Sequence, residues 1–337
     1  MLKNKHSKEE VLQWLTAKGP DLNKLYKQAD SLRQQIMGDE VFLRGILEFS
    51  NYCNQQCDYC GIRAGMKELL RYRMSEEEII DSCKTIEKYG QTTVVLQSGE
   101  DPFYTTEILG QIICKIKEQT SLVVTVSVGE RSKESYKYWL ECGMDRYLLR
   151  YETSNKKFYA QIHNGQNLDD RLACIKNLQE LGVQTGSGFL IGLPGQSLED
   201  IASELLFCSA LNLEMIGVGP FIPHQKTPLG KAKNPFDPEF FFKVIAILRL
   251  LNPKAHIPAT TAFDAVNLHG RNLALKRGAN VFMPNSTPQK YRKYYQLYPG
   301  KPCIDESSED CAKCVVKRIQ NLGRVVGQGP GHSKKLI

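Results

Sequence analysis

The regular alternation of short apolar segments with longer helical patterns is the feature that most constrains the fold of this chain. We predict strands at 43–49, 93–97, 123–128, 147–151, 185–191, 215–221, 256–261 and 280–283. Patterns typical of amphipathic helices fill most of the intervals, and strands that alternate with helices form parallel sheets. About eight such units favour a closed α/β barrel of the (β/α)8 type, with a doubly wound open sheet as the second interpretation.

The segments outside the predicted strands indicate an extension at each end of the barrel. Residues 1–41 have the pattern of amphipathic helices, residues 42–300 form the predicted barrel, and residues 301–337 form an extension with cysteines of its own. The final stretch, 327–337, is rich in glycine and lysine, and we expect it to be mobile. In barrels of this type the reactive groups lie at the carboxyl ends of the strands.

Composition narrows the setting in which the chain works. The first residues are charged, the longest apolar stretch contains Lys243 and Arg249, and the 11 cysteines come without an export signal. These features predict a cytoplasmic protein with free thiols and no membrane span. The net charge of +7 is scattered along the sequence without a basic stripe. This argues against nucleic acid and leaves an anionic substrate or an acidic partner as the explanation.

Three closely spaced cysteines follow the first predicted strand. Cys53, Cys57 and Cys60, in EFSNYCNQQCDYCGIR, have Cx3Cx2C spacing. One loop can therefore present three thiolates to a [4Fe-4S] cluster and leave its fourth iron open. This is the pattern of radical S-adenosylmethionine (SAM) enzymes, in which SAM binds the open iron and reductive cleavage releases a 5′-deoxyadenosyl radical. Tyr59 also fits that pattern, in which the ring packs beside adenine. The alternative is a zinc loop, but zinc sites need a further pair of ligands and no histidine lies nearby.

The ends of the second and fourth strands carry polar residues suited to this cofactor. Gln97 and Ser98, in LQSGEDP, stand where radical SAM proteins have a glycine-rich segment near the methionyl ammonium, although Ser98 departs from that pattern. Arg146, Arg150 and Glu152, in DRYLLRYET, share one strand face, and we expect them at the same rim. A carboxylate there can accept hydrogen bonds from ribose or from the ammonium. An ordinary strand-to-helix turn and a rim salt-bridge network are the respective alternatives.

Later segments add further candidates. Arg171, near the start of a predicted helix, can bind the SAM carboxylate through two parallel hydrogen bonds. Thr260 and Thr261 can offer hydroxyls to an anion, although neighbouring residues of a continuing strand face opposite sides. The glycine-rich fifth strand would let a cofactor approach the backbone, or would only supply small residues to a barrel interior. The histidines, among them His163 and His224, are predicted to be structural or exposed.

Several longer segments resemble one family closely. They are CNQQCDYCGIR, LQSGEDP, DRYLLRYET, GSGFLIGLPGQ, GVGPFIPH, IPATTA, GANVFMPN and YYQLYPGK, and the resemblance extends from about residue 48 to residue 323. The chain resembles the HydE family of [FeFe]-hydrogenase maturases. This resemblance implies a complete radical SAM barrel that helps to assemble the di-iron dithiolate centre, acting on an anionic iron complex with carbonyl, cyanide and cysteine ligands. It also implies a reductant protein and the other maturases as partners.

The resemblance further implies roles for individual residues. It assigns to the SAM site Tyr59, Gln97, Ser98, Glu152, Arg171, Pro220, Ile222, Tyr295 and Leu297. It assigns to the substrate cavity Thr125, Arg146, Arg150, Met215, Thr260, Thr261, Tyr295 and Tyr298. Cations and hydroxyls suit an anionic metal complex, and they would be unfavourable in a dry core. A purely structural polar network is the alternative.

A second group of cysteines lies in the C-terminal extension. Cys303, Cys311 and Cys314 have Cx7Cx2C spacing and resemble an accessory cluster site found in some family members. The site can hold a [4Fe-4S] or a [2Fe-2S] cluster, or its thiols can remain free.

Other functions share parts of this pattern. Biotin synthase requires a second cluster inside the barrel, and none of the predicted strands carries a cysteine. Methylornithine synthase, which would act on an amino-acid-like substrate, differs only in the family-specific segments. A non-catalytic iron–sulfur carrier or scaffold is the alternative from another class, and it predicts no cleavage of SAM.

Overall fold

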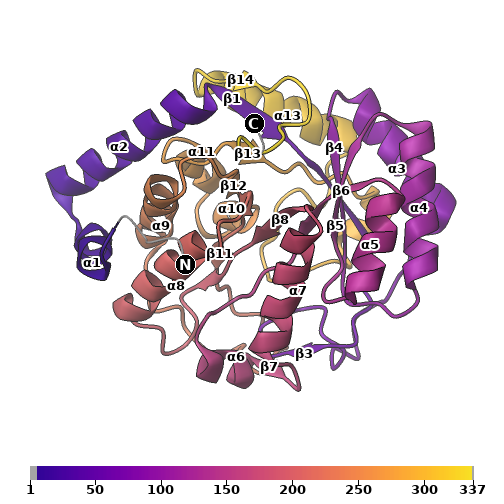
Figure 1. Ribbon diagram of the computed structural model, residues 1–337, viewed down its shortest axis with the longest axis horizontal. Helices are drawn as coiled ribbons and strands as arrows, with labels where there is room; N and C mark the ends of the chain where they lie inside the picture. Colours follow the sequence, from indigo (N-terminus) through magenta and orange to yellow (C-terminus); the bar gives the residue numbers. More distant parts are fainter. Residues whose placement is uncertain (1–5, 336–337) are drawn as a thin grey trace.

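The computed structural model describes residues 6–335 and contains a barrel of parallel strands surrounded by helices (Figure 1). Six strands lie side by side in the order β10-β8-β6-β5-β4-β2, and each pairs in parallel with its neighbour. Their bounds are β2 Gly45–Ser50, β4 Thr93–Ser98, β5 Val123–Ser127, β6 Met144–Leu148, β8 Gln184–Ser187 and β10 Met215–Ile216.

A second set of strands closes the ring. β12 (Pro258–Ala259) pairs with β13 (Val281–Phe282), which pairs with β1 (Glu40–Leu43), all in parallel. Two bridges join this set to the six-stranded sheet, one between Met215 and His256 and one between Ile46 and Asn285. The closed parallel barrel is therefore confirmed, and the doubly wound alternative is excluded because an open sheet would leave two free edges.

Successive side chains of each strand point alternately outward, into a hydrophobic layer between strands and helices, and inward, into the barrel. Val94, Leu96, Val124 and Val126 pack outward in one continuous hydrophobic cluster with the surrounding helices. Those helices are α3 Glu76–Lys88, α4 Thr106–Gln119, α5 Lys133–Glu141, α7 Leu168–Glu180, α8 Leu198–Ala210, α9 Pro238–Leu251, α10 Ala262–Val266 and α11 Gly270–Leu275. The alternate residues of the same strands face inward, so the interior is where polar side chains can meet a ligand.

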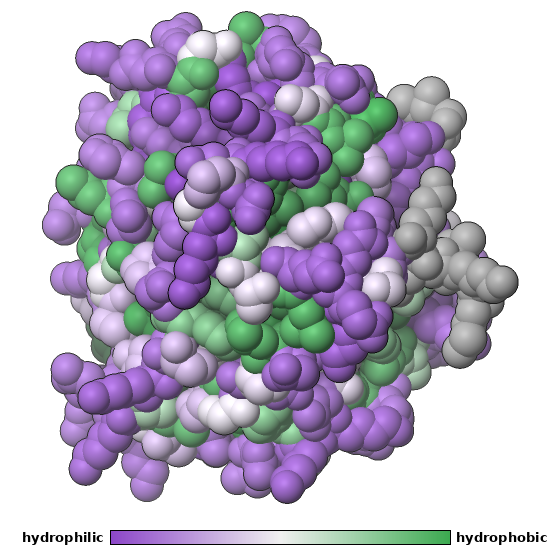
Figure 2. All heavy atoms as spheres, turned by 90° about the vertical axis from the view of Figure 1, so that its left-hand side faces the viewer, coloured by the Kyte–Doolittle hydropathy of each residue, from purple (hydrophilic) through white to green (hydrophobic). Residues whose placement is uncertain are grey.

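Two helices precede the barrel, as the amphipathic pattern predicts. α1 (Lys8–Thr16) and α2 (Gly19–Met37) lie against α8 and α9. The Lys243 amino group of α9 donates to the carbonyls of Leu15 and Ala17, which accounts for a lysine inside a long apolar stretch. On this face of the molecule hydrophilic side chains predominate and separate the hydrophobic ones into smaller groups (Figure 2). Residues 1–5 of the predicted extension lie outside the described residues.

The C-terminal segment returns to the amino ends of the barrel strands. After α12 (Gln289–Arg292) and α13 (Ser308–Asn321), β14 (Val325–Val326) pairs with β1, and Ser333 is fully buried. A Cβ on residue 331 would lie 2.6 Å from the Phe42 ring, so the chain can pass this close to the ring only because residue 331 is glycine. The expected mobility of this segment is therefore wrong up to residue 335, and residues 336–337 lie outside the described residues.

One strand boundary differs in a way that matters for the site. β6 begins at Met144, three residues before the predicted start at 147. Arg146 thus lies inside the strand. Its guanidinium donates to the carbonyls of Pro330 and Gly331 at the floor of the barrel, which is the end where the parallel strands begin. The expectation that Arg146 shares a rim with Arg150 and Glu152 is wrong, because four strand residues span about 13 Å along the barrel axis.

Candidate active site

The loop with the three cysteines lies at the carboxyl end of β2, at the lower edge of Figure 1. Within it, β3 (Gln56–Cys57) pairs antiparallel with β7 (His163–Asn164), which follows α6 (Lys156–Ile162). The Arg71 guanidinium donates to the carbonyls of Asn51, Ile62 and Arg63. These bonds fix both sides of the loop, so the thiols sit on a rigid support.

The three thiols of this loop are partly buried and influence one another electrostatically. Burial raises the pKa of Cys53 and of Cys57, and it raises the pKa of Cys60 to about 12. Neighbouring thiols add to the shift at Cys57, and Arg71 opposes it at Cys53 and Cys60. Such thiols ionise readily only beside a strong cation, and a purely sulfur donor set suits iron–sulfur clusters.

The surroundings of the loop fit such a group. A Cβ on Gly99 would lie 2.2 Å from the Tyr52 carbonyl oxygen and 2.6 Å from the Cys53 Cβ, so the end of β4 packs directly against the cysteine loop. Among residues 6–335, no three His, Cys, Asp or Glu side chains are already arranged as a metal site. The three thiols on one loop, with the end of β4 packed behind them, are a donor set that fits an iron–sulfur cluster.

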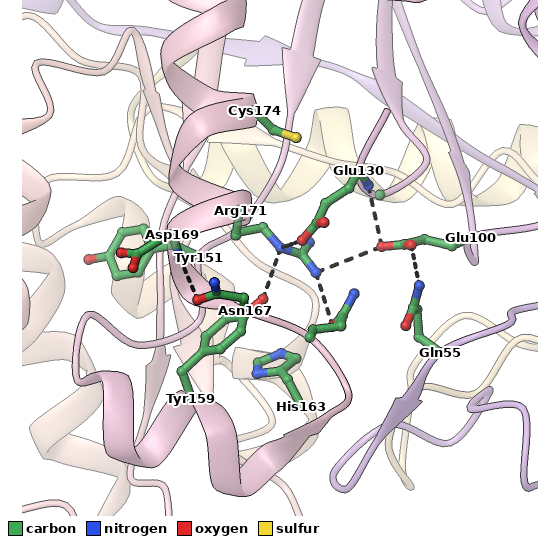
Figure 3. Close-up of polar contacts among 12 residues, drawn as sticks. Gln55, Glu100, Glu130, Tyr151, Tyr159, His163, Asn167, Asp169, Arg171 and Cys174 are labelled. Carbon is green, nitrogen blue, oxygen red and sulfur yellow. Dashed lines mark hydrogen bonds and ion pairs between the residues drawn. The ribbon is translucent and has the colours of Figure 1, made fainter. Parts of the chain in front are cut away.

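Arg171 lies in the first turn of α7 and is the centre of a polar network beside the loop (Figure 3). Its Nε lies 2.7 Å from Glu130 Oε1 and donates to the Tyr159 hydroxyl at 3.2 Å. Its Nη2 lies 3.7 Å from Glu100 Oε1. Although burial opposes the charge, Tyr159, Glu130 and Glu100 together raise the pKa of Arg171. The guanidinium is thus permanently charged and is surrounded by more than one carboxylate.

Glu100 links this network to the cysteine loop. Gln55 Nε2 donates to its second oxygen at 2.7 Å, and the backbone N–H of Glu130 donates to the first. Burial raises the pKa of Glu130, and Arg171 opposes that shift. The carboxylates of Glu100 and Glu130 can accept hydrogen bonds from an ammonium group that binds near the loop.

Tyr59 is held on the other side of the loop. Its hydroxyl lies 3.0 Å from His163 Nε2, and the two rings meet edge to face at 5.5 Å between centroids. Burial raises the pKa of Tyr59 well above its usual value, so the phenol stays neutral. The ring is available as an apolar surface for a planar base.

Residues from the second strand and from the segment after α12 meet at the same rim. Gln97 Nε2 donates to the Tyr295 hydroxyl at 3.2 Å, and the Leu297 carbonyl accepts from the Gly61 N–H at 2.9 Å. The Ser98 hydroxyl donates to the Gly99 carbonyl at 2.6 Å. The structure therefore brings Gln97, Tyr295 and Leu297 to the cysteine loop, as expected, although the Ser98 hydroxyl is directed to its own backbone.

Arg150 and Glu152 form an ion pair at the end of β6. Glu152 has a φ of 66°, in the left-handed region that L-residues rarely adopt. Its backbone is held on both sides, because its N–H donates to the Gly188 carbonyl and its carbonyl accepts from the Leu190 N–H. Glu204, which is buried in α8, accepts from the Thr153 hydroxyl and from the Ser154 N–H just beyond it. This strained conformation directs the carboxylate to Arg150 at the rim.

The fifth, sixth and seventh strands bring their residues to the same end of the barrel. β9 (Leu190–Ile191) pairs with β11 (Gly219–Pro220), which places Pro220 and the following Ile222 beyond the main sheet. Thr260 follows the end of β12, and its hydroxyl donates to the Val218 carbonyl at 3.1 Å. Thr261 begins the turn into α10, so the strand has ended and the two threonines are not restricted to opposite faces.

The interior below the rim contains both paired and unpaired polar groups. The Thr125 hydroxyl is buried and has no hydrogen-bond partner within the part of the chain that the structure describes. The Lys301 amino group forms a buried ion pair with Glu48 and donates to the Tyr295 carbonyl at 3.0 Å. Burial first, and then the Glu48 carboxylate, raises the pKa of Tyr298. Thr125 and Tyr298 are therefore candidates to contact a ligand in the cavity.

At the floor, the Arg44 guanidinium donates to the Met215 sulfur at 2.8 Å and to the Gly331 carbonyl. Burial lowers the pKa of Arg44 well below its usual value and that of Arg146 to about 10, and Arg146 adds to the shift at Arg44. Met215 and Arg146 thus face inward at the opposite end of the barrel from the cysteine loop.

The tail cysteines lie around the start of α13. Cys303 has a φ of 61°, Cys311 is buried, and Cys314 is exposed one helical turn later. A hydrogen bond between Cys303 and Cys311 lowers the pKa of Cys303 and raises that of Cys311, and Arg271 Nη2 lies 3.9 Å from Cys303 Sγ. Two of the three thiols are therefore together, beside a cation.

The structure also brings to the site residues that the sequence analysis did not assign to it, among them Glu130, Glu48, Lys301 and His163. Glu130 directly follows a predicted strand, which is the position where barrel residues reach the rim, so its place could have been recognised. His163 had no comparable signal, because it reaches Tyr59 through the pairing of two short strands that lie about a hundred residues apart in sequence.

Comparisons with known proteins agree with this geometry. The radical SAM superfamily profile matches residues 47–208. The [FeFe] hydrogenase maturase subunit HydE of Thermotoga maritima is 45% identical over 93% of this chain and 89% of its own length. The 3-methylornithine synthase of Methanosarcina barkeri is 30% identical over 90% of this chain and 85% of its own. The solved structure of methylornithine synthase (PylB) superposes with a TM-score of 0.85 at 27% identity, covering 96% of this chain and 94% of that one.

Proposed function

The chain belongs to the HydE family of [FeFe] hydrogenase maturases and is a radical SAM enzyme, and on that premise we propose that it acts in assembly of the di-iron dithiolate centre of [FeFe]-hydrogenase. The observation that carries the proposal is the position of three thiols on one loop at the carboxyl rim of a closed barrel. We further propose that Cys53, Cys57 and Cys60 hold a [4Fe-4S] cluster and that SAM binds beside it. The neighbouring Tyr59 and Arg171 support this arrangement from two sides of the loop.

The residues around the loop suit the parts of SAM in the proposed complex. When bound, the cluster supplies the electron that cleaves a carbon–sulfur bond of SAM. The Arg171 guanidinium can hold the methionyl carboxylate, and Glu100 can accept hydrogen bonds from the ammonium. The Tyr59 ring offers a surface to adenine, while Glu152 and Gln97 can bind the ribose and the polar groups beside it. Arg171 is buried and the other side chains are only partly exposed, which would limit the access of water to the reacting atoms.

The proposed substrate is a small anionic iron complex with carbonyl, cyanide and cysteine ligands. Arg150 and the hydroxyls of Thr260 and Thr261 provide positive charge and donors at the rim, and the unpaired Thr125 hydroxyl offers a donor deeper in the barrel. Met215, Arg146 and Tyr298 complete the proposed lining. A reductant protein and the other hydrogenase maturases are the proposed partners.

A second candidate function is the rearrangement of an amino-acid-like substrate, as in methylornithine synthase. The superposition on PylB favours it, whereas the higher identity to HydE favours hydrogenase maturation. The product would distinguish them: only a methylornithine synthase would form 3-methylornithine from an amino-acid substrate. The biotin synthase alternative lacks support, because the strands that form this barrel carry no cysteine for a second internal cluster.

We also propose an accessory cluster at Cys303, Cys311 and Cys314, supported by the contact between the first two thiols. The test is Cys311→Ala, which should lower the iron content of the reconstituted protein and leave cleavage of SAM largely intact. Complete loss of cleavage would show that the tail thiols act in the reaction itself.

The proposal includes a cytoplasmic location. All 11 cysteines are free thiols, which suits a reducing compartment. No helix within residues 6–335 has the length and hydrophobicity of a membrane span.

The main experiment measures 5′-deoxyadenosine formed from SAM by the anaerobically reconstituted protein with dithionite. We expect turnover by the intact chain and none by Cys57→Ala. Cys83→Ala is the matched control, because this thiol is buried in α3 and should not affect the reaction. An intact protein that binds iron and never cleaves SAM would support the carrier alternative, and zinc at the first cysteine loop would overturn the proposal.

A further inference from the structure

His163 is a buried side chain that none of the proposed roles uses. It is 1% exposed, lies in β7 and pairs through its backbone with Cys57 of the cysteine loop. The Asp58 N–H also donates to the Ile162 carbonyl at 2.8 Å, so two backbone links tie this segment to the loop. The position of His163 is therefore fixed relative to the three thiols.

The imidazole contacts two aromatic residues at once. Its Nε2 lies 3.0 Å from the Tyr59 hydroxyl, and its ring stacks on Tyr159 with centroids 4.1 Å apart and an interplanar angle of 20°. The Tyr159 hydroxyl in turn accepts from Arg171 Nε. Figure 3 shows Tyr159 and His163 side by side below Arg171. The chain of contacts therefore runs without a gap from Tyr59 to Arg171.

The protonation state of His163 suits a hydrogen bond with Tyr59. Burial lowers its pKa to about 3, and the positive charge of Arg171 acts in the same direction. The ring is therefore held in its neutral form, and Nε2 can accept a hydrogen bond from Tyr59. A hydrogen bond from the ring to the Tyr159 backbone opposes part of this shift and also fixes the orientation of the imidazole.

We infer that His163 is a positioning residue that fixes the Tyr59 ring relative to the Arg171 guanidinium, and thereby sets the affinity of the site for SAM. The inference rests on the proposed function, in which Tyr59 faces adenine and Arg171 holds the methionyl carboxylate. These two groups bind opposite ends of one ligand. A rigid link between them lowers the loss of conformational freedom on binding, which is the general benefit of preorganisation.

The test is a double-mutant cycle with His163→Phe, Tyr59→Phe and the double variant, each reconstituted anaerobically. Phenylalanine at 163 keeps an aromatic ring stacked on Tyr159, so the protein should fold and retain its iron. We expect each single variant to raise KM for SAM by roughly 5- to 10-fold, with less than a twofold change in kcat. The double variant should match the worse single variant, because both changes remove the same hydrogen bond.

A spectroscopic reading gives an independent check. In the intact protein, SAM should alter the electron paramagnetic resonance spectrum of the reduced cluster, and His163→Phe should require proportionally more SAM for the same change. His269→Phe is the matched control, because that histidine is exposed near the start of α11 and should leave KM unchanged.

Three results would overturn the inference. They are an unchanged KM in both single variants with normal iron content, additive effects in the double variant, and loss of iron in proportion to loss of activity. If His163→Phe fails to fold, Tyr59→Phe decides, and an unchanged KM in that variant overturns the inference. Failure of the proposed function is distinguishable, since the unmodified protein would then form no 5′-deoxyadenosine.

Discussion

The arginines at the two ends of the barrel have different partners. At the rim, Arg150 is paired with Glu152, and Arg171 lies between Glu130 and Glu100. At the floor, Arg44 and Arg146 donate to carbonyls, to neutral side chains and to a sulfur. Desolvation lowers the pKa of both floor arginines, although the Asp145 carboxylate opposes the shift at Arg146.

The difference shows what each end can do. Charges that already have counter-ions can exchange them for the groups of a ligand with little change in net charge, so the rim is suited to a zwitterion such as SAM. The floor arginines are held in place by the chain that covers them, and within residues 6–335 neither forms a salt bridge with a carboxylate. This charge would favour an anion anywhere in the interior between the two ends.

The buried Glu48–Lys301 pair, on the rim side of the interior, gives the largest expected effect. Glu48→Gln leaves the Lys301 amino group buried without its counter-ion, so we expect a loss of about 3–5 kcal/mol in the free energy of unfolding. Chemical denaturation measures it. The double change Glu48→Gln with Lys301→Met should recover most of the loss, and a single variant as stable as the parent would show that the charge is solvated.

Arg171 should give the next largest effect, and on activity. Arg171→Met removes the proposed carboxylate ligand and leaves Glu130 and Glu100 without their cation, so kcat/KM for SAM should fall about 100-fold or more. Initial rates of 5′-deoxyadenosine formation measure it. The matched floor variant, Arg44→Met, should change the same parameter less than about threefold. Equal losses of kcat/KM in Arg171→Met and Arg44→Met would show that the rim and floor arginines do not differ in their importance for SAM.

The floor should also respond to acid. The side chain of His256 accepts a hydrogen bond from Asn280 Nδ2 at its Nδ1 and donates from its Nε2 to the His332 carbonyl. Burial first and then the nearby Arg44 lower the pKa of His256 well below 6.5. Its folded form thus stays neutral, while the unfolded chain gains a proton as the pH falls below about 6.5. Stability is present above that pH and is lost below it, by up to about 1.4 kcal/mol per pH unit.

Urea unfolding of the parent and of His256→Gln at pH 7, 6 and 5 measures this contribution. The variant should lose less stability between pH 7 and pH 5 than the parent does. Parallel pH profiles would indicate that the imidazole becomes protonated in the folded protein.

The smallest expected effect concerns Arg44 and stability. Replacing a buried charge that lacks a counter-ion by a hydrophobic residue of similar length is often neutral or stabilising. Arg44→Met should therefore leave the free energy of unfolding within about 1 kcal/mol of the parent, or raise it. Thermal unfolding measures it, and a loss of several kcal/mol would show that its bonds to Met215 and Gly331 outweigh the cost of burial.

The strand pattern and the cysteine spacing could be predicted from the sequence because both depend on local order. Apolar runs identify the barrel strands, and the Cx3Cx2C segment identifies the loop. The floor could not be predicted, because glycine-rich composition alone suggested a mobile tail. The close approach of Gly331 to Phe42, which uses that glycine, depends on a contact between residues far apart in sequence.

Local order in the sequence also explains which site residues were placed correctly. Gln97 and Arg171 follow strands or begin helices, so topology brings them to the rim. Arg146 was placed at the wrong end because the start of β6 was predicted three residues late. The roles of these residues in binding SAM or substrate remain predictions.

The left-handed backbone at Glu152 sets stability against activity at a single position. Glycine adopts this conformation without strain, so Glu152→Gly should relieve about 1 kcal/mol of backbone strain. The same change removes the carboxylate that pairs with Arg150. Selection for stability alone would therefore favour glycine at this position, and the role that we propose for the carboxylate at the rim would favour glutamate.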